Sequence, residues 1–148
     1  MSKPKHLMIF RFSSMGDVAM LVPVLRCLYA QNQNIQVTLV TRKQFSPIFK
    51  EFTELQIISP DFFGKHKGFK GLYRLYRELK QIKPHRIADI HQNLRSRILG
   101  LFFRLSFTRI KVIDKGYTER KRLTRPTKKT MKPLTPQHFR YVEVFSRL

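Results

Sequence analysis

The segment Ser13–Asp17, with the sequence SSMGD, places a carboxylate directly behind a short apolar run at residues 6–10. The apolar run predicts a buried first strand, and the apolar residues from Val18 onward predict a helix. Ligands of open α/β sheets bind in the crevice beyond the carboxyl ends of the strands. Asp17 is therefore either a cap of the following helix or a group that touches a substrate.

The first interpretation of this turn is structural. Ser14 and Asp17 have the spacing of a capping box, with Ser14 as the N-cap and Asp17 at the third helical position. The second interpretation is functional, with the amides and hydroxyls of the turn facing the crevice and Asp17 touching substrate. The spacing leaves both interpretations open, and the two are compatible.

The turn lacks the motifs that hold nucleotides. A dinucleotide-binding turn needs three spaced glycines, and this turn has only Gly16. The Gly-Lys-Ser/Thr ending of a phosphate-binding P-loop is also missing. We therefore expect no nucleotide in this crevice, and because no His/Cys set has metal-ligand spacing, we expect no metal site.

A second polar segment follows the predicted fourth strand. His91, Asn93, Arg95 and Arg97 should lie at the same sheet edge as Asp17, because the carboxyl ends of parallel strands meet there. The arginines could bind carboxylates or phosphates of a ligand. Alternatively, Asn93 caps the next helix and the arginines are solvated on its first turns.

Short apolar segments alternate with helical patterns along the chain. Strands are predicted at residues 7–12, 35–41, 55–59, 86–90 and 109–113. Helices are predicted at residues 16–31, 45–52, 69–83, 94–106 and 136–148. This alternation is typical of a Rossmann-like α/β fold, a parallel sheet with helices on both faces.

The composition indicates a globular domain with an anionic partner. The chain has 148 residues, and 30 Lys and Arg against 9 Asp and Glu give a net charge of +21. Such a field attracts nucleic acid, phosphorylated sugars or anionic lipid headgroups. No segment reaches the roughly 20 apolar residues of a membrane span, and the single Cys27 suggests a reducing, cytoplasmic location.

Several segments resemble glycosyltransferase family 9, the lipopolysaccharide heptosyltransferases. Residues 11–18, RFSSMGDV, and then 23–28 look like the opening of that family. Residues 37–40 and 43–48 extend the resemblance. Two later segments continue it in the same order. Residues 88–97 are similar to the family's D-x-H-x-x-x-R-S segment, and residues 138–148 resemble its H…Y helix near the end of the first domain.

The resemblance implies half of a GT-B enzyme, in which two Rossmann-like domains face a cleft. The N-terminal domain of such enzymes holds a lipid-linked sugar acceptor, and the C-terminal domain holds ADP-heptose. We expect an acceptor-binding core at residues 1–114, a basic loop or linker at 115–135, and a helix of the same domain at 136–148. The resemblance implies a glycosyltransferase, but we expect the donor-binding domain to be absent from this chain and the chain alone to be inactive.

The same resemblance implies roles for the polar residues. Asp17 matches the family's proposed base, which deprotonates the acceptor hydroxyl in an inverting displacement with ADP as the leaving group. No cofactor is expected, because an ADP-heptose-like nucleotide sugar is the donor substrate of the complete enzyme. The acceptor-binding residues that we predict beside Asp17 are Ser13, Ser14, Met15, Gly16, His91, Asn93 and Arg95.

The basic face of residues 69–83, with Lys65 and Lys67 before it, leaves alternatives open. It is either an ordinary solvated helix surface or a surface that meets an anionic, phosphorylated lipid at the inner face of the inner membrane. Two other functions compete with the enzyme half. One is a basic nucleic-acid-binding α/β module, although the chain lacks RNP, KH and helix-turn-helix signatures; the other is a truncated remnant without activity.

Overall fold

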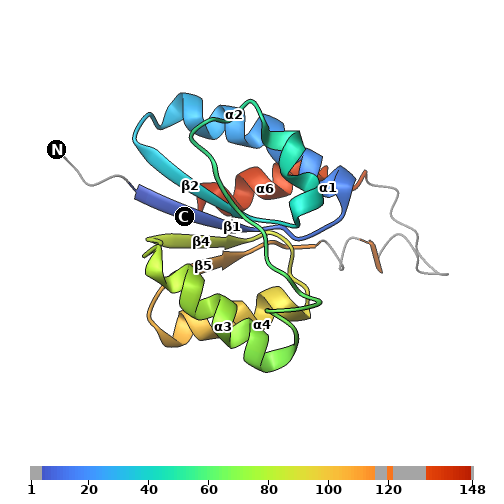
Figure 1. Ribbon diagram of the computed structural model, residues 1–148. Helices are drawn as coiled ribbons and strands as arrows, with labels where there is room; N and C mark the ends of the chain where they lie inside the picture. The colour runs from blue at the N-terminus through green and yellow to red at the C-terminus, as the bar shows by residue number, and fades with distance from the viewer. Residues whose placement is uncertain (1–4, 116–119, 122–132, 148) are drawn as a thin grey trace.

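A parallel sheet forms the centre of the protein in the computed structural model, which describes residues 5–115, 120–121 and 133–147. In this part of the chain the sheet has five strands in the order β3-β2-β1-β4-β5, and every pairing is parallel (Figure 1). The strands are β1 (Lys5–Phe10), β2 (Ile35–Val40), β3 (Gln56–Ile58), β4 (Arg86–Asp89) and β5 (Arg109–Val112).

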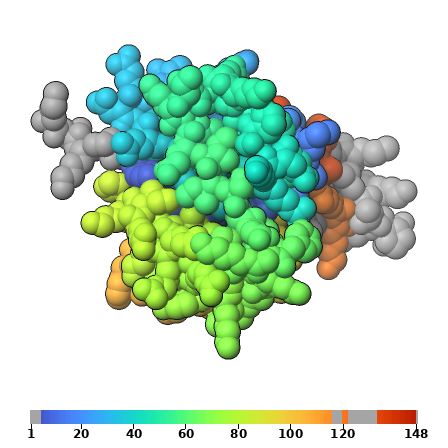
Figure 2. All heavy atoms as spheres, viewed as in Figure 1, coloured from blue at the N-terminus to red at the C-terminus, as the bar shows by residue number. Residues whose placement is uncertain are grey.

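Helices cover both faces of the sheet. They are α1 (Met15–Ala19), α2 (Leu21–Gln31), the 3-10 helix η1 (Lys43–Phe49), α3 (Gly68–Gln81), α4 (Leu94–Leu105) and α6 (Gln137–Ser146). Helices α2 and α6 lie on one face and α3 and α4 on the other (Figure 1). In the space-filling view, α3 in light green covers the lower part of the visible face (Figure 2). The predicted Rossmann-like α/β fold is confirmed.

The central strand β1 contributes side chains to both apolar layers of the core. Leu7 and Ile9 point into the layer shared with α2 and α6, whereas Met8 and Phe10 point into the layer shared with α3 and α4. Successive side chains of a strand point to opposite faces, so a strand buried on both sides is continuously apolar. This is why the apolar run at residues 6–10 could be recognised as a buried parallel strand.

The predicted elements exist, but two helices differ from the prediction. The helix predicted at residues 16–31 is broken at Met20 into α1 and α2. Pro23 explains the break, because it has no N–H and its ring would clash with the carbonyl four residues earlier. The helix predicted at residues 45–52 is a 3-10 helix containing Pro47.

The C-terminal part of the described chain packs on the first apolar layer. Tyr141 and Val144 of α6 are buried in the same cluster as Leu21 and Leu25 of α2. The basic loop or linker predicted at residues 115–135 lies largely outside the described residues. No helix of the described residues is long and apolar enough to cross a membrane.

Candidate active site

A polar pocket of about 370 Å³ lies at the carboxyl edge of the sheet. We call it the strand-end pocket, since it is built from the segments that follow β1, β4 and β5 together with the start of α6. Parallel strands bring these segments to one edge, where α/β folds bind ligands. The residues that line the pocket are Arg11, Ser13, Ser14, Asp17, His91, Lys115, Arg120 and Gln137.

Arg11 fixes the carboxylate of the pocket. Its guanidinium is buried, with 7% of the side chain exposed, and it donates to the Ile90 carbonyl at 2.7 Å and to Oδ2 of Asp17. A buried cation needs such partners, because an unpaired charge in the protein interior is costly. Arg11 therefore links the end of β4 to the first turn of α1 and holds Asp17 at the mouth of the pocket.

The capping-box interpretation of Ser14 and Asp17 is wrong. Ser14 stands at the N-cap position of α1, but its side chain makes no capping hydrogen bond. Instead, its hydroxyl donates to Oδ2 of Asp17 at 3.0 Å. The carboxylate turns to Arg11 because a charge-assisted hydrogen bond to guanidinium is stronger than one to a backbone amide.

In the described part of the chain, only one carboxylate oxygen of Asp17 accepts hydrogen bonds. Both Arg11 and Ser14 donate to Oδ2, and within the described part of the chain no group donates to Oδ1. The Asp17 side chain is 40% exposed, so Oδ1 is accessible to a ligand. From the other side, the buried Tyr141 of α6 donates its hydroxyl to the Asp17 carbonyl at 3.0 Å, which anchors the turn to the core.

His91 is a neutral group in a cationic environment. Burial, together with the positive charges of Arg11 and Lys115, lowers its pKa to about 4. Its ring packs edge-on against Phe12, with 5.2 Å between the ring centroids. The imidazole can therefore offer one donor and one acceptor to a ligand but does not act as a cation at neutral pH.

We expect His91 to titrate with a midpoint near pH 4 in NMR spectra of its imidazole. Because the folded pKa lies below the unfolded value of about 6.5, the unfolded chain takes up the proton first. The free energy of unfolding should thus decrease as pH falls from about 6.5 toward 4. A midpoint at or above the value measured in the denatured chain would contradict this environment.

Asp89 shapes the loop that carries His91. Its carboxylate accepts from the backbone N–H groups of His91 at 3.1 Å and of Gln92 at 2.8 Å. Burial raises its pKa, and these hydrogen bonds oppose that shift. Lys115 closes the loop by donating to the Gln92 carbonyl at 3.0 Å. Asp89 thus has a structural role in this loop.

The second polar segment is divided between the pocket and the start of α4. Oδ1 of Asn93 accepts from the backbone N–H of Ser96 at 2.8 Å, and the Ser96 hydroxyl accepts from the N–H of Asn93 at 3.0 Å. This is a capping box, so the structural alternative for Asn93 is confirmed. Arg95 places its guanidinium over the ring of Phe62, 5.0 Å from the centroid.

Replacing Asn93 with Ala should lower the free energy of unfolding by about 1 kcal/mol, because the first turn of α4 loses its cap. Urea denaturation would measure this change. Asn93→Ser is the matched control, since serine is also a good N-cap and should restore most of the stability. An Asn93→Ala protein as stable as the original would show that the cap contributes little.

The structure brings some of the predicted site residues together and separates others. Ser13, Ser14 and His91 line the strand-end pocket with Asp17, whereas Met15, Gly16, Asn93 and Arg95 are not part of its lining. Sequence reasoning missed Arg11, Lys115, Arg120 and Gln137. For Arg11 a signal existed, since a lone arginine directly after a buried strand requires a partner. The substrate roles of all these residues stay predictions.

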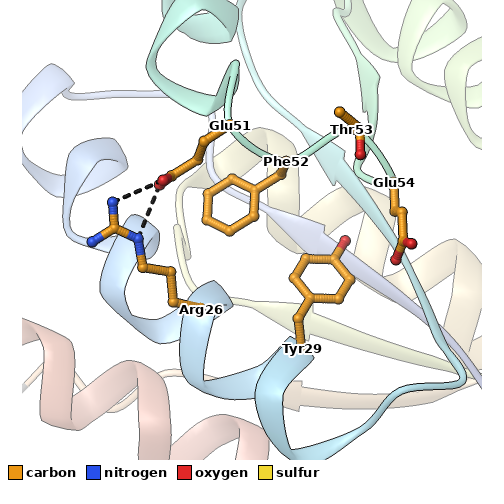
Figure 3. Close-up of a pocket in the computed structure, with 6 residues that line it drawn as sticks. All are labelled: Arg26, Tyr29, Glu51, Phe52, Thr53 and Glu54. Carbon is orange, nitrogen blue, oxygen red and sulfur yellow. Dashed lines mark hydrogen bonds and ion pairs between the residues drawn. The ribbon is translucent and has the colours of Figure 1, made fainter.

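Another pocket, of about 360 Å³, lies between α2 and the segment after η1 (Figure 3). Arg26 donates to both carboxylate oxygens of Glu51, at 3.1 and 2.8 Å. Tyr29 packs beside Phe52, and burial together with the charge of Glu54 raises its pKa to about 12. None of the predicted site residues lines this pocket, and none of the segments that follow the carboxyl ends of β1, β4 and β5 contributes to it.

The strand-end pocket has the chemistry for an anionic, hydroxyl-rich ligand. Three cations and two serine hydroxyls surround Asp17, the only carboxylate among the described residues of the lining. Guanidinium and ammonium groups bind phosphate and carboxylate, and the serines can bond to hydroxyls. No cluster of three His, Cys, Asp or Glu that could hold a metal ion occurs in the described residues.

No protein-family model and no curated protein matches the chain. Solved structures match it, among them a family 9 glycosyltransferase from Veillonella parvula DSM 2008. That protein is 19% identical, the match covers 99% of this chain and 42% of the other, and the TM-score is 0.67. E. coli heptosyltransferase WaaC matches as well, over 96% of this chain and 47% of WaaC. Its structure with ADP is 15% identical with a TM-score of 0.61, and its structure with ADP-2-deoxy-2-fluoro heptose is 16% identical with a TM-score of 0.66.

At these identities the likeness shows the fold. The protein has a Rossmann-like domain of the kind found in GT-B glycosyltransferases. More particularly, the neighbours are a family 9 glycosyltransferase and a heptosyltransferase, which supports the resemblance carried by the SSMGD turn. The chain spans less than half the length of these structures.

Proposed function

We propose that the chain is the acceptor-binding half of an inverting glycosyltransferase similar to those that move heptose from ADP-heptose to the lipopolysaccharide inner core. One observation carries this proposal. Asp17 is held by the buried Arg11 so that Oδ2 is occupied while Oδ1 stays accessible in the strand-end pocket. A carboxylate fixed in this way can receive a proton at a defined position.

In the proposed reaction the acceptor hydroxyl lies against Oδ1 of Asp17. Its oxygen forms a bond to the anomeric carbon while the bond from that carbon to the phosphate oxygen of ADP breaks, and the electron pair leaves with ADP. The hydroxyl proton passes to Oδ1. The hydroxyl becomes far more acidic as its new bond forms, so late transfer to a carboxylate paired with guanidinium is reasonable. The same negative charge stabilises oxocarbenium-like charge at the anomeric carbon.

The cations of the pocket are proposed to hold an anionic, lipid-linked sugar acceptor. Lys115 and Arg120 line the strand-end pocket, and Asp17 is the only carboxylate among its described lining residues. Neutral His91 and Ser13 complete the wall with hydrogen-bonding groups. A sugar that carries carboxylates or phosphates fits this charge and these donors.

The nucleotide sugar is proposed to be bound by a second domain, and the chain alone is proposed to be inactive. Supporting this, the neighbours are about twice as long as the part that matches this chain, and the turn after β1 has none of the glycine motifs that bind pyrophosphate. The proposed location is the cytoplasmic face of the inner membrane.

The test is a transfer assay on the natural gene product, with ADP-heptose as the donor and a deacylated, phosphorylated lipid A core saccharide as the acceptor. We expect heptose transfer with inversion at the anomeric carbon, measured by mass spectrometry and NMR. The chain of 148 residues alone should bind the acceptor saccharide without consuming ADP-heptose. Absence of acceptor binding, or turnover by the chain alone, would contradict the proposal.

The net charge of +21 favours nucleic-acid binding as the second candidate function. Such binding would show a steep decrease of RNA affinity with salt concentration. A filter-binding titration of an RNA oligonucleotide at several salt concentrations distinguishes the two functions. Tight RNA binding together with no affinity for the saccharide would favour the nucleic-acid module, and neither activity would indicate a remnant.

A further inference from the structure

Helix α4 carries an unpartnered stripe of leucines and arginines on its outer side. Its inner side is buried against the sheet through Leu99 and Phe103. Leu94, Leu101 and Leu105 point away from that core and are 74%, 54% and 70% exposed. Their spacing of seven and four residues places the three leucines on one helix face. Arg97 and Arg104 are exposed beside them.

Helix α3 extends this apolar stripe sideways. Phe69 and Tyr73 are exposed and contact Phe102 of α4 edge-on, with ring centroids 5.4 and 5.5 Å apart. Phe107, which follows α4, is 97% exposed. We call the outer side of these two helices the α3–α4 surface, and its apolar members are Phe69, Tyr73, Leu94, Leu101, Leu105 and Phe107. Exposed apolar residues grouped in this way mark an interaction site.

The cations of the α3–α4 surface have no compensating charge. Its exposed basic residues include Lys70, Arg74, Arg77, Arg97 and Arg104, and none of these five forms an ion pair within the described part of the chain. The two helices contain one carboxylate, Glu78, which is paired with Lys65 at 2.6 Å and with His66 at 3.2 Å. The surface is therefore both apolar and strongly positive.

We propose that the α3–α4 surface docks the protein on an anionic lipid bilayer. The leucines and phenylalanines enter the boundary between headgroups and acyl chains, while the five cations bind the lipid phosphates. Interfacial helices that lie on membranes combine leucine or phenylalanine with lysine or arginine in this manner. A second copy of the chain is a poor partner for this surface, because both copies would carry the same positive charge.

Nucleic acid fits the surface less well than a membrane does. Single-stranded nucleic acid is held by cations together with aromatic rings on which the bases stack. Three of the six apolar residues here are leucines on the outermost helix face, and these have nothing to recognise in a nucleotide. Positive charge alone would attract either nucleic acid or an anionic membrane, so the exposed leucines are the feature that favours the membrane.

Docking through this surface would bring the strand-end pocket close to the membrane. Leu94 begins α4 at the carboxyl edge of the sheet, three residues after His91, which lines the pocket. A sugar attached to a lipid in the bilayer would then need only a short reach to enter the pocket. This last step rests on the proposed function, whereas the docking itself does not.

The first arm of the test measures vesicle co-sedimentation of the purified chain. Vesicles of phosphatidylcholine alone are compared with vesicles of phosphatidylcholine and phosphatidylglycerol in equal parts. We expect binding to the anionic vesicles only, and a loss of about tenfold or more in the Leu101→Ser/Leu105→Ser variant. The matched control is Phe139→Ser/Val142→Ser on α6, at the other face of the sheet, which should bind as well as the original chain. Circular dichroism melting confirms that each variant is folded.

The second arm tests the charges. Arg97→Gln/Arg104→Gln should also lower binding about tenfold or more. The control Lys43→Gln/Lys50→Gln, at the first residue and the C-cap of η1, removes the same charge from the other face and should change binding little. Leucine substitutions without effect on vesicle binding would overturn the proposal. So would an RNA oligonucleotide that binds more tightly than the anionic vesicles and depends on the arginines alone. Vesicle binding by a protein that fails in the saccharide assay would contradict the proposed function while leaving this surface intact.

Discussion

Replacing Asp17 with Asn is expected to lower the kcat of glycosyl transfer by about 10²–10⁴-fold, the range that removal of a general base produces. The amide keeps the size of the carboxylate, and its oxygen can still accept from Arg11 and Ser14, which now both donate to Oδ2. What the variant loses is the ability to take up the proton of the acceptor hydroxyl. The transfer assay on the natural gene product measures this loss.

The kinetic constants distinguish this role from a structural one. A base that acts in the transition state changes kcat, whereas a residue that only binds the acceptor changes KM. Glu54→Gln is the matched control, because it removes a carboxylate from the pocket beside Tyr29, away from the strand ends, and should leave both constants unchanged. Unchanged turnover in the folded Asp17→Asn protein would exclude Asp17 from the mechanism.

The fold could be predicted from the sequence because its main determinants are local. Apolar runs such as residues 6–10 are continuous where the strand is buried on both faces, and the 3–4 spacing of apolar residues in α3 reports its single buried side. The errors are local as well. The break at Met20 arises from Pro23, a residue whose effect reaches back one helical turn.

The site was harder to predict, because its geometry depends on residues far apart in the chain. Arg11 meets the carbonyl of Ile90, 79 residues away, and Tyr141 meets the Asp17 carbonyl from 124 residues away. No spacing rule reports such contacts. The capping-box pattern at Ser14 failed because the guanidinium of the nearby Arg11, which also donates to the distant Ile90 carbonyl, lies within reach of the carboxylate. At Asn93 the same kind of pattern holds, because Asn93 and Ser96 are neutral and each accepts from the other's backbone N–H.

Arg11 is the residue whose substitution should separate charge from geometry. In Arg11→Lys the positive charge stays, but an ammonium group on a flexible stem does not reproduce the planar fork that serves the Ile90 carbonyl and Asp17 together. We expect the free energy of unfolding to decrease by about 1–3 kcal/mol, because one buried partner is left unsatisfied. The loss stays within that range because the Asp17 side chain is partly exposed and can be solvated.

The same substitution should lower transfer without removing the base. Oδ1 of Asp17 would keep its basicity but lose its fixed position, and small displacements of a reacting group reduce rates strongly. A double-mutant cycle with Asp17→Asn tests this coupling. If Arg11 acts through Asp17, the loss of turnover in the double variant should be close to that of Asp17→Asn alone and well below the product of the two single losses. Multiplicative losses would instead show that Arg11 contacts the substrate independently, for instance through an anionic group of the acceptor in the strand-end pocket.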